Sequence, residues 1–266
     1  MYLVSVENVN FNYFNKKILK EINFSVKENE FILLLGGNGA GKSTMLRLIA
    51  GIHIAYQFNQ FNVLGTDRPL DQTNGLAYLG NRWVRNSAFT GQSAYTGDIR
   101  VGDMMKKWQM ENIERRDELV QVLGIDLEWR MHEVSDGQRK RVQIMIALLK
   151  PFRLVIIDEF LSELDIVVRD KMFHYLKKEC KLRNGSLIYA THVFDDLEVW
   201  MDSVVYISNG MCEDKIDMST FKQDKSLYQA VKEKLLQDKE MEIEALDTKL
   251  LGGAGGYTNG RLLDFV

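Results

Sequence analysis

The chain has little of what would place it in a membrane or in a secreted disulfide scaffold. Its 266 residues include two cysteines, Cys180 and Cys212, which are too few for a disulfide framework and are not spaced as metal ligands. The N-terminus lacks a basic segment followed by a long apolar stretch, so we expect no signal peptide. The longest apolar runs, 31–35 and 144–149, are too short to cross a bilayer. We therefore expect no intrinsic membrane span and a cytoplasmic location, with the nucleus as a second location.

An excess of positive charge is also missing. The 34 basic and 37 acidic residues leave a formal net charge of -3, which gives no global field for nucleic acid and leaves only a local basic patch as such a site. We therefore expect no nucleic-acid partner. Hydrophobic residues make up 45% of the chain and charged residues 27%, proportions that are usual for a soluble globular protein.

Short apolar runs alternate with helical patterns along most of the chain. Strand-like runs lie at 3–6, 22–26, 31–35, 76–79, 154–157, 187–190 and 204–207. Helical spacing of apolar residues is found at 43–50, from about 98 to 150, and at about 167–182. Strand, helix and strand in succession predict parallel βαβ units, so the predicted fold class is α/β.

The same patterns predict the domain organisation. Residues 1–215 are expected to form one α/β domain with a mostly helical insertion at about 82–150. Residues 216–266 begin as a charged, loosely amphipathic stretch, which predicts a surface helix, and the glycine-rich run 252–256 predicts a flexible tail. An interaction domain is the less favoured interpretation of this last segment.

A glycine-rich segment follows the buried run 31–35 and opens the next helical pattern. It reads Gly36-Gly-Asn-Gly-Ala-Gly41-Lys42-Ser43 and matches a phosphate-binding loop, for which a strand before and a helix after are the expected context. Its backbone amides and the helix N-terminus present partial positive charge to phosphate. Lys42 is expected to reach the β- and γ-phosphates of ATP, and Ser43 to offer its hydroxyl to Mg²⁺. The predicted nucleotide-binding residues are Gly36, Asn38, Gly39, Ala40, Gly41, Lys42, Ser43 and Thr44.

Two carboxylates follow the buried run 154–157. Asp158 would point toward the phosphate loop and, with Ser43, hold Mg²⁺, usually through water. Glu159 is placed to polarise a water that attacks the γ-phosphate, and His192, after the run 187–190, to contact that phosphate. Alone, the acids would suggest a helix N-cap and the histidine a structural role. Beside a phosphate loop, Glu159 and His192 are predicted to be catalytic.

A second polar cluster precedes the helical pattern that Pro151 closes. It reads Val134-Ser135-Asp136-Gly137-Gln138; Ser135 suits a helix N-cap, and the glycine and glutamine add phosphate-facing donors. With the phosphate loop and the acid pair, it resembles the nucleotide-binding domain of ABC ATPases over about residues 1–215. The resemblance implies a P-loop ATPase core with a parallel sheet, an N-terminal antiparallel β subdomain and a helical signature subdomain.

The resemblance also assigns roles by position. Residues 36–44 match the Walker A loop, with Gly37 where proline is common, and Tyr13 sits where the family stacks an aromatic ring on adenine. The signature sequence is matched at Ser135, Gly137 and Gln138, while Val134 and Asp136 depart from it.

Further positions match the catalytic part of the family pattern. Asp158 and Glu159 match Walker B and the catalytic glutamate, Asp165 lies in a segment that resembles the D-loop, and His192 matches the switch histidine. In this family ATP lies between two domains, with the Walker A loop of one facing the signature of the other. One copy of each motif therefore implies an ATP-dependent homodimer.

One departure bears on coupling to a membrane partner. After the run 76–79 the family usually has a glutamine that contacts magnesium and couples to that partner, whereas this chain has Asn81, which is one methylene shorter. Asn81 is therefore a candidate metal ligand, and the shorter side chain argues against standard coupling to a transporter.

A narrower resemblance rests on residues 129–132, 135–138, 149–151 and 190–195. These look like the eukaryotic soluble ABC proteins of the Ccr-associated factor type, which are linked in yeast to the Ccr-Not complex of transcription and mRNA regulation. This implies an ATPase that uses ATP and Mg²⁺, closes as a dimer and serves a protein complex of that type. Two alternatives stay open: the ATP-binding subunit of a transporter with a separate membrane protein, and an ATP-binding interaction module with negligible hydrolysis.

Overall fold

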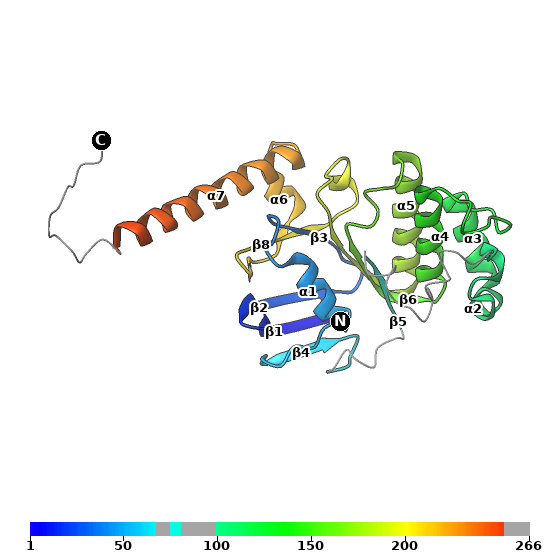
Figure 1. Cartoon of the computed structure of the whole chain (residues 1–266), viewed down its shortest axis with the longest axis horizontal. Coiled ribbons are helices and arrows are strands. Elements are labelled where there is room, and N and C mark those ends of the chain that lie inside the picture. Colours follow the sequence, from blue (N-terminus) through cyan, green and yellow to red (C-terminus); the bar gives the residue numbers. More distant parts are fainter. Residues whose placement is uncertain (68–74, 81–98, 253–266) are drawn as a thin grey trace, which may run out of the picture.

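The N-terminal strands form a small antiparallel sheet in the computed structural model, which describes residues 1–67, 75–80 and 99–252, with the side chains of 240–252 excepted. β1 (Tyr2–Tyr13) pairs with both β2 (Lys16–Lys27) and β4 (Gln60–Val63), in the order β2-β1-β4. Figure 1 shows this sheet beside the larger central sheet.

The central sheet carries the phosphate loop and the acid pair. Its strand order is β10-β8-β3-β7-β6-β5, and β9 pairs with β8. The strands are β3 (Phe31–Leu35), β5 (Gly75–Leu79), β6 (Phe152–Asp158), β7 (Ser186–Ala190), β8 (Ser203–Ser208), β9 (Met211–Cys212) and β10 (Ile216–Asp217). The ladders β8–β3, β3–β7, β7–β6 and β6–β5 are parallel, so the loops after β3, β6 and β7 meet at one edge. The predicted α/β fold class is confirmed.

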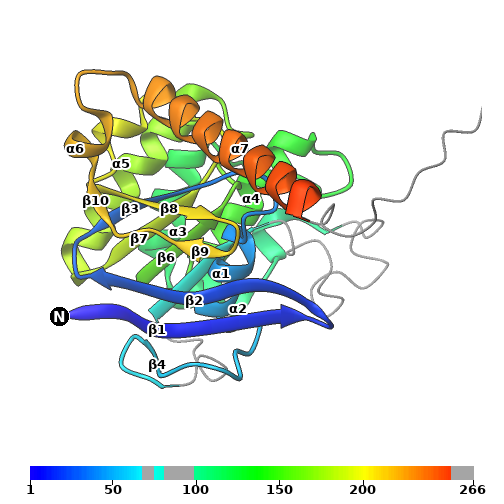
Figure 2. The same cartoon turned by 90° about the vertical axis from the view of Figure 1, so that its left-hand side faces the viewer.

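Helices cover both faces of the central sheet, as Figures 1 and 2 show. α1 (Lys42–Ile49) lies between the two sheets, where Met45 and Leu46 pack with Ile32 and Leu34 of β3. The other face of β3 packs with α4 (Asp136–Leu148) and α5 (Ile166–Arg183). Because β3 is buried on both faces, its sequence is apolar throughout rather than alternating.

A helical layer lies beyond α4 and α5. It contains the short 3-10 helix η3 (Val101–Asp103), α2 (Lys106–Glu111) and α3 (Ile113–Leu123). Arg115 of α3 forms a buried ion pair with Glu179 of α5 and donates a 2.7 Å hydrogen bond to the Leu148 carbonyl. The layer is therefore tied to the central domain by a charged contact as well as by apolar packing.

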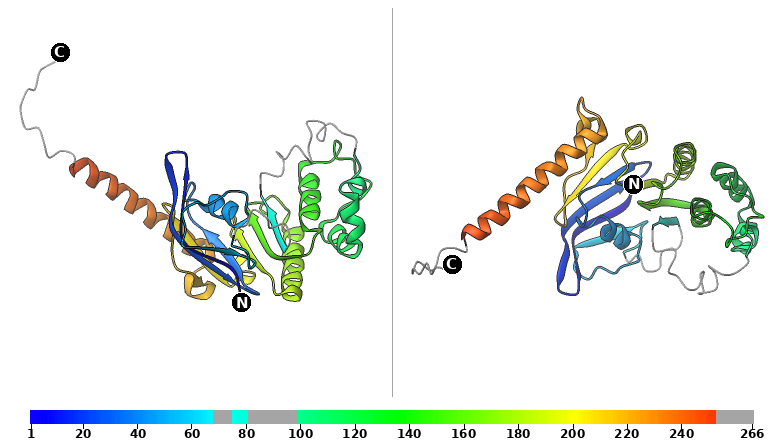
Figure 3. Two further views of the ribbon diagram at one scale, coloured as in Figure 1. Left: turned by 90° about the horizontal axis from the view of Figure 1, so that it is seen from below. Right: turned by 45° about the horizontal axis from the view of Figure 1, so that its top comes forward.

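The C-terminal part is helical, as the sequence predicts, but its first turns are not merely on the surface. After η4 (Leu197–Val199) and α6 (Met218–Lys222), α7 (Leu227–Gly252) begins with Leu227 and Val231, which are 1% and 2% exposed. Figure 3 shows the rest of α7 projecting away from the domain. The predicted boundaries at 82–150 and 216–266 stay predictions, since 81–98 and 253–266 lie outside the described residues.

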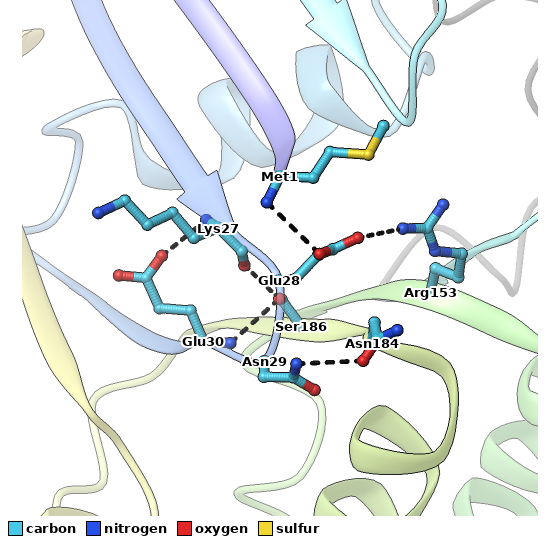
Figure 4. A network of polar contacts seen from close by, with 8 residues as sticks. All are labelled: Met1, Lys27, Glu28, Asn29, Glu30, Arg153, Asn184 and Ser186. Atoms are coloured by element: carbon cyan, nitrogen blue, oxygen red, sulfur yellow. Dashed lines mark hydrogen bonds and ion pairs between the residues drawn. The ribbon is translucent and has the colours of Figure 1, made fainter.

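A polar network fixes the two sheets to each other at the edge opposite the phosphate loop, and Figure 4 shows its members. The Glu28 carboxylate accepts a 2.7 Å hydrogen bond from the Arg153 guanidinium of β6 and forms an ion pair with the N-terminal amine. The Ser186 hydroxyl at the start of β7 donates to the Lys27 carbonyl (2.5 Å) and accepts from the Glu30 amide (3.1 Å). Several partly buried bonds of this kind orient the antiparallel sheet against the strands that carry the site.

Candidate nucleotide-binding site

The phosphate loop needs glycine at positions where another residue would not fit. Gly36, Gly39 and Gly41 have φ of 145°, 80° and 112°, values that L side chains disfavour. A Cβ at Gly36 would lie 2.1 Å from the Ile207 carbonyl oxygen, and one at Gly41 would lie 2.7 Å from Leu19 Cδ2. The loop is thus pressed against β8 and β2, which holds its backbone in place before any ligand binds.

Lys42 begins α1 and folds back over the loop. Its ammonium donates to the carbonyl oxygens of Gly36 at 2.8 Å and Gly37 at 3.0 Å. Burial lowers the pKa of Lys42, while the nearby charges of Glu159 and Asp158 act in the opposite sense. This side chain presents a largely desolvated donor inside the loop, which suits an anionic phosphate.

Asp158, at the end of β6, is held by hydroxyl groups from two other elements. The Ser43 hydroxyl donates to Oδ1 at 2.8 Å, and the Tyr78 hydroxyl of β5 donates to Oδ2 at 3.2 Å. Burial raises the pKa of Asp158, and the two hydrogen bonds and the charge of Arg47 lower it. Burial raises the pKa of Tyr78 to about 12, so this phenol stays a hydrogen-bond donor.

Glu159 and His192 form the outer part of this group. His192 Nε2 lies 2.8 Å from Glu159 Oε1, and both side chains remain partly exposed, at 45% and 37%. The Glu159 backbone has a φ of 59°, and its amide donates to the Ala190 carbonyl of β7 at 2.8 Å. A glutamate in the left-handed region turns its side chain away from the strand direction, and the β6–β7 contact holds it there.

The loop, Glu159 and His192 surround a cleft of 290 Å³, and Asp158 does not line it but is bonded to Ser43, which does. The cleft is lined by loop residues of 37–44, by Glu159 and His192, and on the side of β2 by Lys16 and Ile18. A second cleft, of 440 Å³, lies on the outer side of the loop and is closed by α7. The structure therefore brings together the predicted loop, Asp158, Glu159 and His192.

The signature cluster is not part of this group. Ser135 is the N-cap of α4, and Ser135 and Gln138 form a reciprocal capping box with bonds of 3.2 and 2.9 Å. Asp165 caps α5 through the Val168 amide and pairs with Arg141 at 2.8 Å. Neither these residues nor Gly137 line the two clefts at the loop. Asn81 lies outside the described residues.

Tyr13 stands next to the cleft without lining it. Its register partner on β2 is Lys16, which does line the cleft. The Tyr13 hydroxyl is 2.7 Å from His53 Nε2, and the Phe11 ring lies edge-on to Tyr13 at 4.9 Å. In this conformation the ring packs toward α1 rather than into the nucleotide cleft.

Several residues at the site were not singled out from the sequence. Tyr78 and Arg47 stand behind Asp158, and α7 contributes Leu235, Asp238 and Lys239 to the outer cleft. The only sequence signal for Tyr78 is a polar hydroxyl in a strand next to the acid-bearing strand. No signal in the pattern of α7 shows which surface it covers.

The oxygen donors at the loop fit Mg²⁺ better than a softer metal. The Ser43 hydroxyl and the Asp158 carboxylate are hard ligands that touch each other, and Mg²⁺ takes its remaining ligands from water and phosphate. Within the described ranges no group of three or more His, Cys, Asp or Glu could hold a metal by itself. A metal here would accordingly depend on the nucleotide.

The protein is a P-loop ATPase by class. Its phosphate loop follows the buried parallel strand β3, and its acid pair stands at the end of β6 in the same sheet. The model of the family described as "ABC transporter" matches residues 19–162, and the chain belongs to this family of ATP-binding, ATP-hydrolysing cassettes. No helix in the described part of the chain is long and apolar enough to span a membrane.

Two curated relatives and two solved structures illustrate the similarity. The chain is 38% identical over 235 residues to ABC transporter I family member 20 of Arabidopsis thaliana, covering 86% of this chain and 71% of that one. It is 36% identical over 214 residues to CCR4-associated factor 16 of Saccharomyces cerevisiae, covering 74% and 72%.

The structural neighbours are more distant in sequence and bear on the fold alone. An ATP-binding subunit of an ABC transporter superposes with a TM-score of 0.73 at 22% identity, covering 87% of this chain and 98% of that one. A dimeric ATP-binding cassette in a post-hydrolysis state with ADP and Pi has a TM-score of 0.64 at 19% identity, covering 81% and 98%.

Proposed function

We propose that two copies of this chain close on Mg-ATP and open after hydrolysis, and that this cycle serves a regulatory protein complex of the Ccr-Not type. The observation that carries the proposal is an incomplete site. The loop, Glu159 and His192 line one cleft and Asp158 is bonded to Ser43 of the loop, whereas the capped N-terminus of α4 at Ser135 is not part of this cleft. A second copy would supply that helix N-terminus, which is suited to an anion.

The proposed roles follow from the position of each side chain. Lys42 and the loop amides bind the phosphates and stabilise the charge that develops on them. Ser43 and Asp158 would hold Mg²⁺, which neutralises charge on the β- and γ-phosphates when bound. Glu159 orients and deprotonates the attacking water, and His192 holds Glu159 and the γ-phosphate in line.

The dimer and the regulatory role are supported by different relatives. A structural neighbour is a dimeric cassette bound to ADP and Pi. A curated relative carries the name CCR4-associated factor, which favours a regulatory complex over a membrane partner. A transporter subunit remains the alternative, because the Arabidopsis relative at 38% identity is named as a member of an ABC transporter family.

The catalytic part of the proposal is tested by Glu159→Gln. This variant should keep ATP affinity and lose roughly 10²–10⁴ in single-turnover hydrolysis, the usual contribution of a general base. Glu118→Gln is the control, because Glu118 is a carboxylate of α3 that pairs with Lys178 far from the cleft. Unchanged hydrolysis by Glu159→Gln would show that the glutamate has another role.

The partner is tested by purifying the tagged chain from its native cells and identifying what comes along. Recovery of subunits of an mRNA-regulating complex is the expected result. Stable recovery with membranes through a high-salt wash would favour the transporter alternative instead.

A further inference from the structure

The 440 Å³ cleft on the outer side of the phosphate loop is bounded in part by α7, a helix that belongs neither to the loop nor to the sheet that carries it. Its walls are Gly36–Ala40, His192, Ser208 and Asn209 on one side, and Leu235, Asp238 and Lys239 of α7 on the other. α7 approaches the loop closely, since a Cβ built on Gly37 would lie 3.9 Å from Leu235 Cδ2. Whatever docks on this face of the loop must therefore also meet α7.

The rotation of α7 about its axis is fixed by polar contacts on the side of β8. The Tyr206 hydroxyl donates to Asp238 Oδ2 at 2.7 Å, and Lys234 pairs with Glu213 at 2.8 Å. Leu235 and Lys239 are four residues apart, so both stand on the helix face that looks onto the cleft. Lys239 is exposed, and among the side chains that the structure describes no carboxylate pairs with it.

Asp136, at the start of α4, carries the exposed negative charge that complements the positive charge of Lys239. It is the first residue of α4, directly after the Ser135 cap, and stands where the family signature has glycine. Its side chain is 97% exposed, although it forms a 2.5 Å pair with Arg139 in its own helix. Such an exposed pair is weak and leaves the carboxylate free to meet a second cation.

The exposed ion pair with Arg139 neutralises Asp136 only in part, so a carboxylate at this point disfavours the proposed closed dimer unless a second cation faces it. The Ser135–Gln138 helix start would approach the phosphates of the other copy, and a negative side chain there would be repelled by them. Within one chain α7 lies over β8 and α4 over β5, near opposite edges of the central sheet, and Figures 1 and 3 show the two helices apart. The lysine of one copy is therefore available only to the aspartate of another.

We propose that α7 is part of the dimer interface and that Lys239 of one copy pairs with Asp136 of the second copy. This inference rests on the proposed ATP-dependent dimer and adds to it a charged contact outside the nucleotide. The partner surface is the N-terminal turn of α4 on a second copy of this chain. In a twofold dimer the pair occurs twice, so one substitution removes two contacts.

The experiment is a charge reversal in full-length protein. All variants carry Glu159→Gln, so that bound ATP is retained, and dimer dissociation is measured with Mg-ATP by mass photometry and analytical ultracentrifugation. Lys239→Glu and Asp136→Lys should each raise the dissociation constant about 10- to 100-fold, because each turns two attractive contacts into repulsive ones. The double reversal should restore most of the parent affinity.

Lys232→Glu is the matched control, because Lys232 is an exposed lysine of the same helix that does not line the cleft. It should leave the dimer unchanged. Rescue by the double reversal separates a direct pair from simple damage to the signature turn, and thermal melts check that each monomer is folded. Single reversals without effect, or a double reversal no better than either single one, would overturn the pair while leaving the dimer intact. A parent protein that stays monomeric with Mg-ATP would overturn the proposed dimer and the pair together.

Discussion

Removing one hydroxyl, in Tyr78→Phe, tests whether Asp158 is held in place by its neighbours. The hydroxyl donates to Asp158 Oδ2 at 3.2 Å, and Ser43 holds the other oxygen. A hydrogen bond to a charged group contributes about 1.5–3 kcal/mol, and at this length we take the lower value of about 1.5 kcal/mol. The variant should therefore lose about tenfold in the part of ATP affinity that depends on Mg²⁺.

The assay compares dissociation constants for a fluorescent ATP analogue in Mg²⁺ and in EDTA. Tyr78→Phe should bind as the parent does in EDTA, because the phosphate loop is untouched, and should gain less from Mg²⁺. The effect should also depend on pH. The Tyr78 bond lowers the pKa of Asp158 against the effect of burial, so its loss raises that pKa. On acidification the variant should then lose its Mg²⁺ response at a higher pH than the parent.

Tyr175→Phe is the matched control, since it removes a buried hydroxyl that has no hydrogen-bond partner in the described structure. It should change neither constant. An unchanged Mg²⁺ response in Tyr78→Phe would refute the positioning of Asp158 by this phenol. An equal loss in Mg²⁺ and in EDTA would show instead that the hydroxyl acts on the loop.

Three further substitutions have defined outcomes. Gly80→Ala would place a Cβ 2.6 Å from the Tyr78 hydroxyl, so this variant should displace the Tyr78 ring and lose the same Mg²⁺ response as Tyr78→Phe. The double variant of Gly80→Ala with Tyr78→Phe should bind Mg-ATP no more weakly than either single variant. Lys42→Ala should weaken ATP binding by about 10- to 100-fold in direct titration, and equal affinity would contradict its role in the loop. Glu179→Ala leaves Arg115 buried without its carboxylate, which should cost about 3–5 kcal/mol and lower Tm by about 10 °C, whereas a shift below 2 °C would mean that the pair is dispensable.

Local sequence patterns predicted most of the fold because each depends on near neighbours. The run 31–35 is apolar throughout because β3 is buried on both faces, and the glycines after it mark the turn into α1. The acid pair Asp158 and Glu159 ends β6, where parallel strands gather their C-terminal loops. A strand, a loop and a helix in succession are enough to place such residues at one edge of the sheet.

Contacts between distant segments were not predictable in the same way. Tyr78 and Asp158 are 80 residues apart in the chain, and the parallel β5–β6 pairing brings them together. The stacking of Tyr13 on adenine stays a prediction, and the strand pattern does not show that the Tyr13 hydroxyl meets His53, which follows α1. The side-chain direction of an aromatic at a hairpin end depends on what packs beneath it, and the strand pattern carries no information about that.

The glycines at 37 and 80 differ in what their surroundings require. At Gly80 the Tyr78 ring occupies the space of a side chain, with its hydroxyl 2.6 Å from the Cβ position. Glycine at 80 is therefore the residue that lets the Tyr78 ring keep its place beside Asp158. At position 37, which is often proline in the family, a Cβ would lie 3.9 Å from Leu235 Cδ2, an ordinary van der Waals distance. The docking of α7 thus does not demand glycine at 37, and the departure from proline there has no structural explanation.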